Sequence, residues 1–167
     1  ANTARHLGMN VIGFDPYLSV DAAWRLSSHI TKAKNMDQIF KEADYITVHV
    51  PLNDGTKHML NKDAFAMMKD GVRILNFSRG ELVNNDDIKA AIASGKVASY
   101  VVDFPCAETV NQEGIIAIPH LGASTVESED NCAVMAAQEI ADFLENGNIL
   151  NSVNFPNCEL PLGGKGR

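Results

Sequence analysis

The chain has 167 residues, 46% of them hydrophobic and 21% charged, which is the composition of a globular protein large enough to bury a core. Its formal net charge of −7 argues against nucleic acid or an anionic membrane as a main partner, because both are negatively charged. No apolar stretch approaches the roughly 18 residues needed to span a bilayer. The cysteines Cys106, Cys132 and Cys158 lack C-x-x-C spacing, so we expect no disulfide framework and no metal site, and reduced thiols in the cytoplasm.

Apolar segments rich in β-branched residues alternate with amphipathic segments, as they do in βαβ units. In chain order we expect the end of a helix at residues 1–7, a strand at 11–14, a helix at 36–42, a strand at 45–50, a helix at 61–69, a strand at 72–77, a helix at 84–93, strands at 97–103 and 115–119, and a long helix at 124–145. The strands lack strict alternation, which is typical of a parallel sheet buried on both faces. The sequence thus predicts an α/β fold.

Two of the expected helices have clear end signals. Asn84 or Asn85 can cap the helix that follows, and the two aspartates after them favour a helix N-terminus. The last helix should stop at Asn146-Gly147, because glycine readily adopts the left-handed conformation that ends many helices.

The strand expected at residues 11–14 is followed by Asp15, an arrangement found in dinucleotide-binding folds. There the carboxylate binds the ribose hydroxyls of NAD, and it would repel the 2′-phosphate of NADP. The alternative is local, since an Asp before Pro16 also commonly begins a turn.

The glycine-rich phosphate loop normally lies about 20 residues before such an acid. Here it would fall before residue 1, and the chain contains no G-x-G-x-x-G. We therefore expect a Rossmann-type doubly wound parallel sheet, truncated at its N-terminus, with the first strand and the glycine-rich loop absent and a gap in mid-sheet. The isolated chain should fold poorly and bind NAD weakly, and calorimetric titration with NAD would test this expectation.

Three residues with complementary chemistry, Arg79, Glu108 and His120, come shortly after three of the expected strands. Parallel strands place their carboxyl ends at one edge of the sheet, so a cation, a carboxylate and an imidazole can meet in one crevice. Taken singly, each has an ordinary structural alternative: a surface arginine, a turn glutamate and a structural histidine.

Several longer motifs accompany these three residues. They are Phe14-Asp15-Pro16-Tyr17, His49-Val50-Pro51-Leu52, Asn76-Phe77-Ser78-Arg79-Gly80, Asp103 with Glu108, and Pro119-His120-Leu121-Gly122-Ala123-Ser124-Thr125. With these motifs in this order, the chain resembles the D-isomer-specific 2-hydroxyacid dehydrogenases over nearly its whole length. Residues 145–148 and 151–156 are most similar to the phosphoglycerate dehydrogenases within that family.

The resemblance implies a catalytic role for each of the three residues, and general chemistry supports these roles. His120 would be the acid/base group, because an imidazole titrates near neutrality. Glu108 would orient the imidazole and stabilise its protonated form, as the carboxylate of a catalytic triad does. Arg79 would bind the substrate carboxylate through its planar guanidinium, so Arg79→Lys should be damaging.

The resemblance also implies NAD as the cofactor and a set of residues that contact it. Asp15 would bind the adenosine ribose, Val50 and Pro51 would flank the adenine end, and Asp103 would bind the carboxamide. The remaining implied contacts are Phe77, Ser78, Arg79, His120, Gly122 and Ala123. Many relatives have smaller residues where this chain has Phe77-Ser78, so the contacts there are the least defined.

The implied substrate is 3-phosphoglycerate, oxidised in serine biosynthesis by a parent protein that is a homodimer or homotetramer. Residues 1–156 would be a partial NAD-binding domain, and 157–167 a linker towards a C-terminal ACT-like domain. Two alternatives stay open: another D-2-hydroxyacid dehydrogenase, of the glyoxylate or D-lactate type, and a non-enzymatic NAD-responsive scaffold resembling corepressors. Outside the site, we expect His49 to serve strand packing.

Overall fold

The computed structural model describes residues 1–159. The chain divides into two compact units, Ala1–Pro119 and His120–Arg167, and each unit is described by itself. None of the helices within the described residues is long and apolar enough to cross a membrane.

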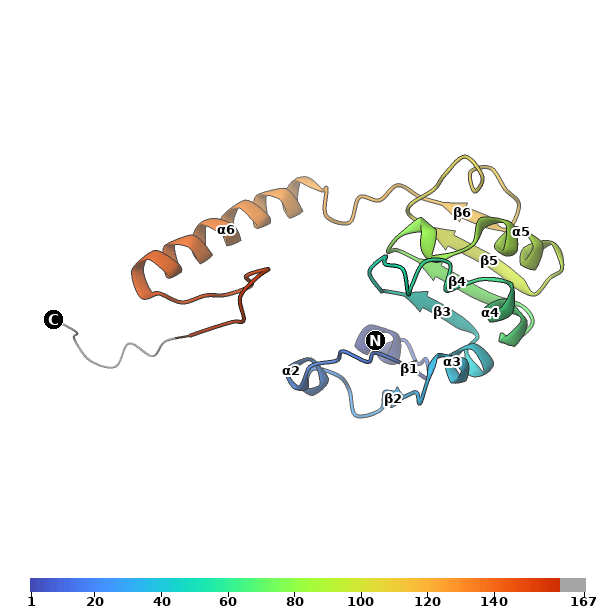
Figure 1. The fold of residues 1–167 in the computed structure, drawn as a ribbon, viewed down its shortest axis with the longest axis horizontal. Coiled ribbons are helices and arrows are strands. Elements are labelled where there is room, and N and C mark those ends of the chain that lie inside the picture. Colours follow the sequence, from blue (N-terminus) through green and yellow to red (C-terminus); the bar gives the residue numbers. More distant parts are fainter. Residues whose placement is uncertain (160–167) are drawn as a thin grey trace. The chain divides into compact units, whose positions relative to one another are not determined.

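The first unit contains parallel strands in two separate sheets (Figure 1). The smaller sheet pairs β1 (Ile12–Gly13) with β2 (Thr31–Lys32). The larger sheet has the order β3 (Tyr45–Val48), β4 (Val72–Asn76), β5 (Val97–Val102) and β6 (Ile115–Ala117). The expected α/β fold with a parallel sheet is confirmed.

Helices connect most of these strands, and three of them are capped by asparagine. The helices of the first unit are α1 (Asn2–His6), α2 (Val20–Trp24), α3 (Met36–Glu42), α4 (Lys62–Met67) and α5 (Asn85–Ala93). Asn35, Asn61 and Asn84 each accept hydrogen bonds from backbone N–H groups of the first turn of α3, α4 and α5, which satisfies donors that a helix leaves unpaired. The sequence predicted α3 to the residue, but it did not predict α2 or β2.

Helices α3, α4 and α5 pack over one face of the larger sheet and bury the core there (Figure 1). On that face Ile46, Ile74 and Tyr100 are in register on three neighbouring strands, and all three are buried. On the other face Tyr45 and Arg73 are exposed, with the guanidinium 5.2 Å from the ring centroid.

Within the first unit these three helices all lie on one face of the larger sheet, and burial of its other face stays a prediction. Strands β3 to β6 follow one another across this sheet in a single direction. Crossover connections between parallel strands are right-handed, so a series that runs in one direction places its helices on one side. Residues along each strand then alternate between that covered side and the other.

The second unit is built around α6 (Val126–Asn146). Thr125 caps its start by accepting a hydrogen bond from the Ser128 N–H, and Gly147 ends it in the left-handed conformation, with φ 73°. The predicted stop at Asn146-Gly147 is thus confirmed. Ile149 and Cys158 form an antiparallel bridge after the helix. Most of the linker predicted at 157–167 lies outside the described residues.

Candidate active site

A cavity of about 450 Å³ lies where the chain leaves β3 and β4. Both strands end at the same edge of the sheet because they are parallel, so the segments that follow them are neighbours. The cavity is lined by His49, Val50, Pro51 and Leu52 after β3, and by Phe77, Ser78 and Arg79 after β4. Five residues predicted to contact cofactor or substrate are thereby brought together: Val50, Pro51, Phe77, Ser78 and Arg79.

Arg79 is exposed at this cavity and is held by two local contacts. Its Nη1 donates a hydrogen bond of 2.7 Å to the Ser78 carbonyl, and its guanidinium carbon lies 5.0 Å from the ring centroid of Phe104. The aromatic ring favours the cation through its π-face. Because a guanidinium carries five N–H donors, donors are left for a ligand carboxylate.

Arg79 is followed directly by a short 3₁₀ helix, η1 (Gly80–Leu82), which the sequence did not predict. Gly80 packs closely against the loop after β5, since a Cβ placed on it would lie 3.1 Å from the Phe104 carbonyl oxygen. The arginine is therefore fixed between the end of a strand and a helical turn rather than carried on a long loop.

Two predicted cofactor residues make hydrogen bonds that limit what they can offer a ligand. The Ser78 hydroxyl donates to the Val48 carbonyl at 2.9 Å, so its proton points into the protein and its lone pairs remain for a ligand. One oxygen of Asp15 accepts from the Tyr17 N–H at 2.8 Å. This is the turn that an Asp before Pro16 commonly begins, and it leaves the second carboxylate oxygen for a ribose hydroxyl.

Asp103 directly follows β5 and is 8% exposed. Its backbone N–H donates to the Asn76 carbonyl at 3.3 Å, which extends the pairing of β4 and β5 by one residue. Asp103 is therefore the first residue of the loop that leads to Glu108.

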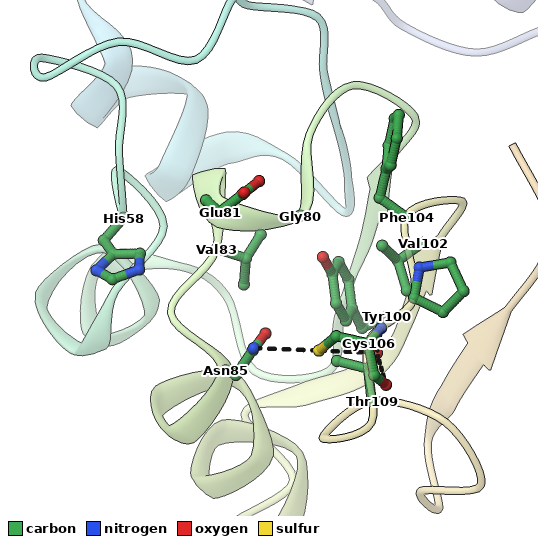
Figure 2. A pocket seen from close by; sticks show the side chains of 11 residues that line it. His58, Gly80, Glu81, Val83, Asn85, Tyr100, Val102, Phe104, Cys106 and Thr109 are labelled. Carbon is green, nitrogen blue, oxygen red and sulfur yellow. Dashed lines mark hydrogen bonds between the residues drawn. The ribbon is translucent and has the colours of Figure 1, made fainter.

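Glu108 is exposed and is held from the neighbouring helix. Nδ2 of Asn85, the first residue of α5, donates to Oε2 of Glu108 at 2.6 Å and approaches the Cys106 Sγ at 3.4 Å. Figure 2 shows the Asn85 amide pointing towards the Cys106 thiol. The pKa of Lys89 is raised, first by its hydrogen bond to Asp86 and further by the negative charge of Glu108.

A second cavity, of about 290 Å³, lies beside this loop (Figure 2). Asn85, Tyr100, Phe104 and Cys106 are among its lining residues. The Tyr100 side chain is almost fully buried, and this burial raises its pKa to about 12. The hydroxyl is therefore a neutral hydrogen-bonding group across the physiological range.

The other predicted site residues, His120, Gly122 and Ala123, belong to the second unit, where all three are exposed. The first unit thus carries Arg79 and Glu108, and the second begins at His120. Within the described residues no group of three or more His, Cys, Asp or Glu side chains could hold a metal ion.

Three residues of the site region were missed by sequence reasoning. His49 is exposed at the first cavity and shares a 2.8 Å hydrogen bond with Thr47, so the expectation that it serves strand packing is wrong. Its position directly before Val50 and Pro51, which are predicted to contact the cofactor, is the sequence signal that could have placed His49 at the site. The sequence indicates Asn85 only as a possible helix cap and Asn76 only as part of a motif.

The chain is similar in sequence to dehydrogenases of other organisms over most of its length. It is 34% identical to a D-3-phosphoglycerate dehydrogenase of Bacillus subtilis (strain 168), over 93% of the chain and 30% of the relative. It is also 34% identical to D-3-phosphoglycerate dehydrogenase 2, chloroplastic, of Arabidopsis thaliana, over 93% of the chain and 26% of the relative. The chain therefore spans less than a third of the length of these relatives.

Solved structures of the same kind share the fold. The crystal structure of a glyoxylate reductase from Paecilomyes thermophila superposes with a TM-score of 0.76 at 26% identity, covering 92% of this chain and 47% of the other. The family model described as D-isomer specific 2-hydroxyacid dehydrogenase, NAD binding domain, matches residues 1–124. The predicted family, its Rossmann-type fold and NAD as its cofactor are thus confirmed: the chain belongs to the D-isomer specific 2-hydroxyacid dehydrogenases, in their NAD-binding domain.

Proposed function

We propose that the intact protein oxidises a D-2-hydroxy acid with NAD, and that this substrate is 3-phosphoglycerate, converted to 3-phosphohydroxypyruvate in serine biosynthesis. The observation that carries the proposal is the cavity after β3 and β4, where Arg79 meets four residues expected to contact the cofactor. The choice of substrate is supported by the relatives, among which D-3-phosphoglycerate dehydrogenases predominate.

Each of the three catalytic residues has one task in the proposed reaction. Arg79 binds the substrate carboxylate through two parallel N–H···O hydrogen bonds and so fixes the reacting carbon. His120 takes the proton of the C2 hydroxyl while the C2 hydrogen leaves with its electron pair, so that a C=O bond forms. Glu108 stabilises the protonated imidazole. When bound, NAD supplies the acceptor for the hydride.

The residues of the first unit fit such a cofactor. Val50, Pro51 and Phe77 offer apolar surface for ring systems in a cavity that also has polar lining residues. The Ser78 lone pairs and the second oxygen of Asp15 can accept from ribose hydroxyls. Asp103, Gly122 and Ala123 complete the proposed contacts.

Further expectations for the intact protein rest on the family. We propose that residues 1–156 form part of the NAD-binding domain, that 157–167 connect it to a further domain, and that the protein is a homodimer or homotetramer. The 167-residue chain by itself should be inactive. A cytoplasmic location remains a prediction from the free cysteines Cys106, Cys132 and Cys158.

The test is an NADH-formation assay of the intact protein with a panel of acids. We expect the highest kcat/KM with D-3-phosphoglycerate, lower values with D-lactate and D-glycerate, and none with L-lactate. NADP should be a poor substitute for NAD because Asp15 would repel the 2′-phosphate. A preference for glyoxylate reduction or D-lactate oxidation would transfer the proposal to that substrate. NAD binding without turnover of any hydroxy acid would favour a non-enzymatic scaffold.

A further inference from the structure

Asn76 is a polar side chain at the centre of an apolar core. It is the last residue of β4 and its exposed fraction is 0%. The strand register places it between Val48 of β3 and Val102 of β5, and both of these residues are buried. An amide in such surroundings is costly unless its donors and acceptor are all hydrogen-bonded, so the bonds that it makes show why it is there.

The Asn76 amide makes three hydrogen bonds, two to the turn that carries Arg79 and one to Tyr100 of β5. Nδ2 donates to the Arg79 carbonyl at 2.8 Å and to the Tyr100 hydroxyl at 3.2 Å. Oδ1 accepts from the Ser78 N–H at 3.2 Å. One side chain therefore ties together both ends of the turn that leads from the strand to the arginine.

The same turn is anchored on its two sides by neighbouring strands. The Ser78 hydroxyl donates to the Val48 carbonyl of β3, and the Tyr100 hydroxyl comes from β5. The Arg79 carbonyl also accepts from the Leu82 N–H at 3.2 Å, which closes η1. Asn76 supplies the connection on the β5 side, because it bonds both to the turn and to the Tyr100 hydroxyl.

The chemistry of the position favours asparagine over other residues of similar size. The contacts require two N–H donors and one acceptor on a short, planar group. Aspartate would offer no donor to the Arg79 carbonyl and would place a charge in the core, leucine would offer neither group, and glutamine is one methylene longer.

We infer that Asn76 is a positioning residue for Arg79: through its hydrogen bonds to Ser78 and to the Arg79 carbonyl it holds the guanidinium in place for the substrate carboxylate. This inference rests on the proposed function of Arg79. Small displacements of a group that orients substrate have large kinetic effects, and a shift of about 1 Å can cost on the order of 100-fold.

The first experiment is a double-mutant cycle in the intact protein, with kcat/KM for the hydroxy acid as the readout. Asn76→Ala should lower kcat/KM by about 10- to 100-fold in the otherwise unchanged protein. In an Arg79→Ala background, the same substitution should change kcat/KM by less than about threefold, because residues that act through one group are not additive. Equal losses in both backgrounds would overturn the inference.

A matched control separates positioning from stability. Asn61→Ala removes an amide that accepts two backbone hydrogen bonds at the start of α4, but this amide makes no hydrogen bond to the turn of Arg79. It should lower the melting temperature while leaving kcat/KM within about twofold, as expected for a site without shared partners. If Asn61→Ala reduces kcat/KM as much as Asn76→Ala does, the role of Asn76 is only structural.

A second measurement does not depend on turnover. Backbone and side-chain ¹⁵N relaxation of Arg79 reports its order directly. We expect Asn76→Ala to lower the order parameters of Arg79 and Asn61→Ala to leave them unchanged, even if the protein proves inactive on every hydroxy acid. Unchanged order in Asn76→Ala would refute the inference, whereas inactivity of the unaltered protein would count against the proposed function alone.

A milder variant covers the case in which Asn76→Ala does not fold. Tyr100→Phe keeps the core filled and removes only the hydroxyl that accepts from Asn76. It should lower both the Arg79 order parameters and kcat/KM, but less than Asn76→Ala does. The expected decrease in kcat/KM is about two- to fivefold. Normal values for both would count against the network.

Discussion

Asn85 donates a hydrogen bond of 2.6 Å from Nδ2 to Oε2 of Glu108, although the two residues are 23 positions apart in the chain. The bond joins the first turn of α5 to the loop after β5. It gives an exposed carboxylate a defined direction.

The bond between Asn85 and Glu108 leads to a first prediction. Asn85→Ala should lower kcat/KM for the hydroxy acid by about two- to tenfold, the range that corresponds to one ordinary hydrogen bond. Steady-state kinetics with saturating NAD measures the effect. Asn84→Ala is a suitable neighbour control because it removes the helix cap instead; a similar loss in that variant would mean that α5, not Glu108, was disturbed.

Arg79→Lys should raise KM for the hydroxy acid by about 10- to 100-fold, while KM for NAD changes little. Lysine keeps the charge but lacks the planar fork that binds a carboxylate through two hydrogen bonds. It also loses the flat contact with the Phe104 ring. Initial rates at varied acid and at varied NAD separate the two constants, and an unchanged KM for the acid would remove Arg79 from the substrate site.

His120→Ala should lower turnover by about 10² to 10⁴ fold if His120 is the acid/base group. The matched control is His29→Ala, which alters an exposed histidine of the first unit whose Nδ1 lies 3.5 Å from the Ser27 hydroxyl. Single-turnover measurements with bound NAD isolate the chemical step. Retention of normal turnover in His120→Ala would refute the assignment.

Alanine substitutions at two glycines with the same backbone conformation should lower the free energy of unfolding by different amounts. Gly95 and Gly114 both have φ near 77°, but a Cβ on Gly95 would meet nothing within 4 Å, whereas one on Gly114 would lie 2.5 Å from Cγ2 of Ile92. Gly95→Ala should therefore cost only the conformational strain, about 1 to 2 kcal/mol. Gly114→Ala should cost more, and urea unfolding of the two variants compares them; equal losses would mean that Ile92 moves aside freely.

Tyr100 predicts how stability depends on alkaline pH. Burial raises its pKa from 10.0 to about 12 in the folded protein, so between these values the unfolded chain loses a proton that the folded chain keeps. The contribution of Tyr100 to the free energy of unfolding is fully present below pH 10 and is lost as pH rises towards 12. The slope is up to about 1.4 kcal/mol per pH unit. Urea unfolding at pH 9 and pH 11 measures it, and Tyr100→Phe should flatten the dependence.

Elements with local signals were predictable from the sequence. The amphipathic segment at Met36–Glu42 gave α3 to the residue, and Asn84 and Gly147 mark the ends of α5 and α6 as capping chemistry requires. Arg79 could be placed at a strand end for the same reason, since an apolar run followed by polar residues is a local pattern. The short elements α2, β2 and η1 lack such patterns and were missed.

What could not be predicted depends on contacts between distant residues. Asn76 meets Tyr100 and Asn85 meets Glu108 across more than 20 positions, and neither pairing leaves a trace in spacing or periodicity. The position of α3, α4 and α5 on one face of the larger sheet follows from the order of its strands, which a single sequence does not state. His49 was misjudged because its neighbours in the chain resemble a strand, while its side chain faces the cavity.

The amide of Asn76 has a consequence for anyone who wishes to make this protein more heat-resistant. A polar residue surrounded by Val48, Ile74 and Val102 is the first that a core redesign would replace with a hydrophobic one. Such a replacement would fill the interior, but it would take away the hydrogen-bond partner of the Ser78 N–H and of the Tyr100 hydroxyl and release the turn in front of the arginine. A redesign for heat resistance should therefore leave this one position unchanged.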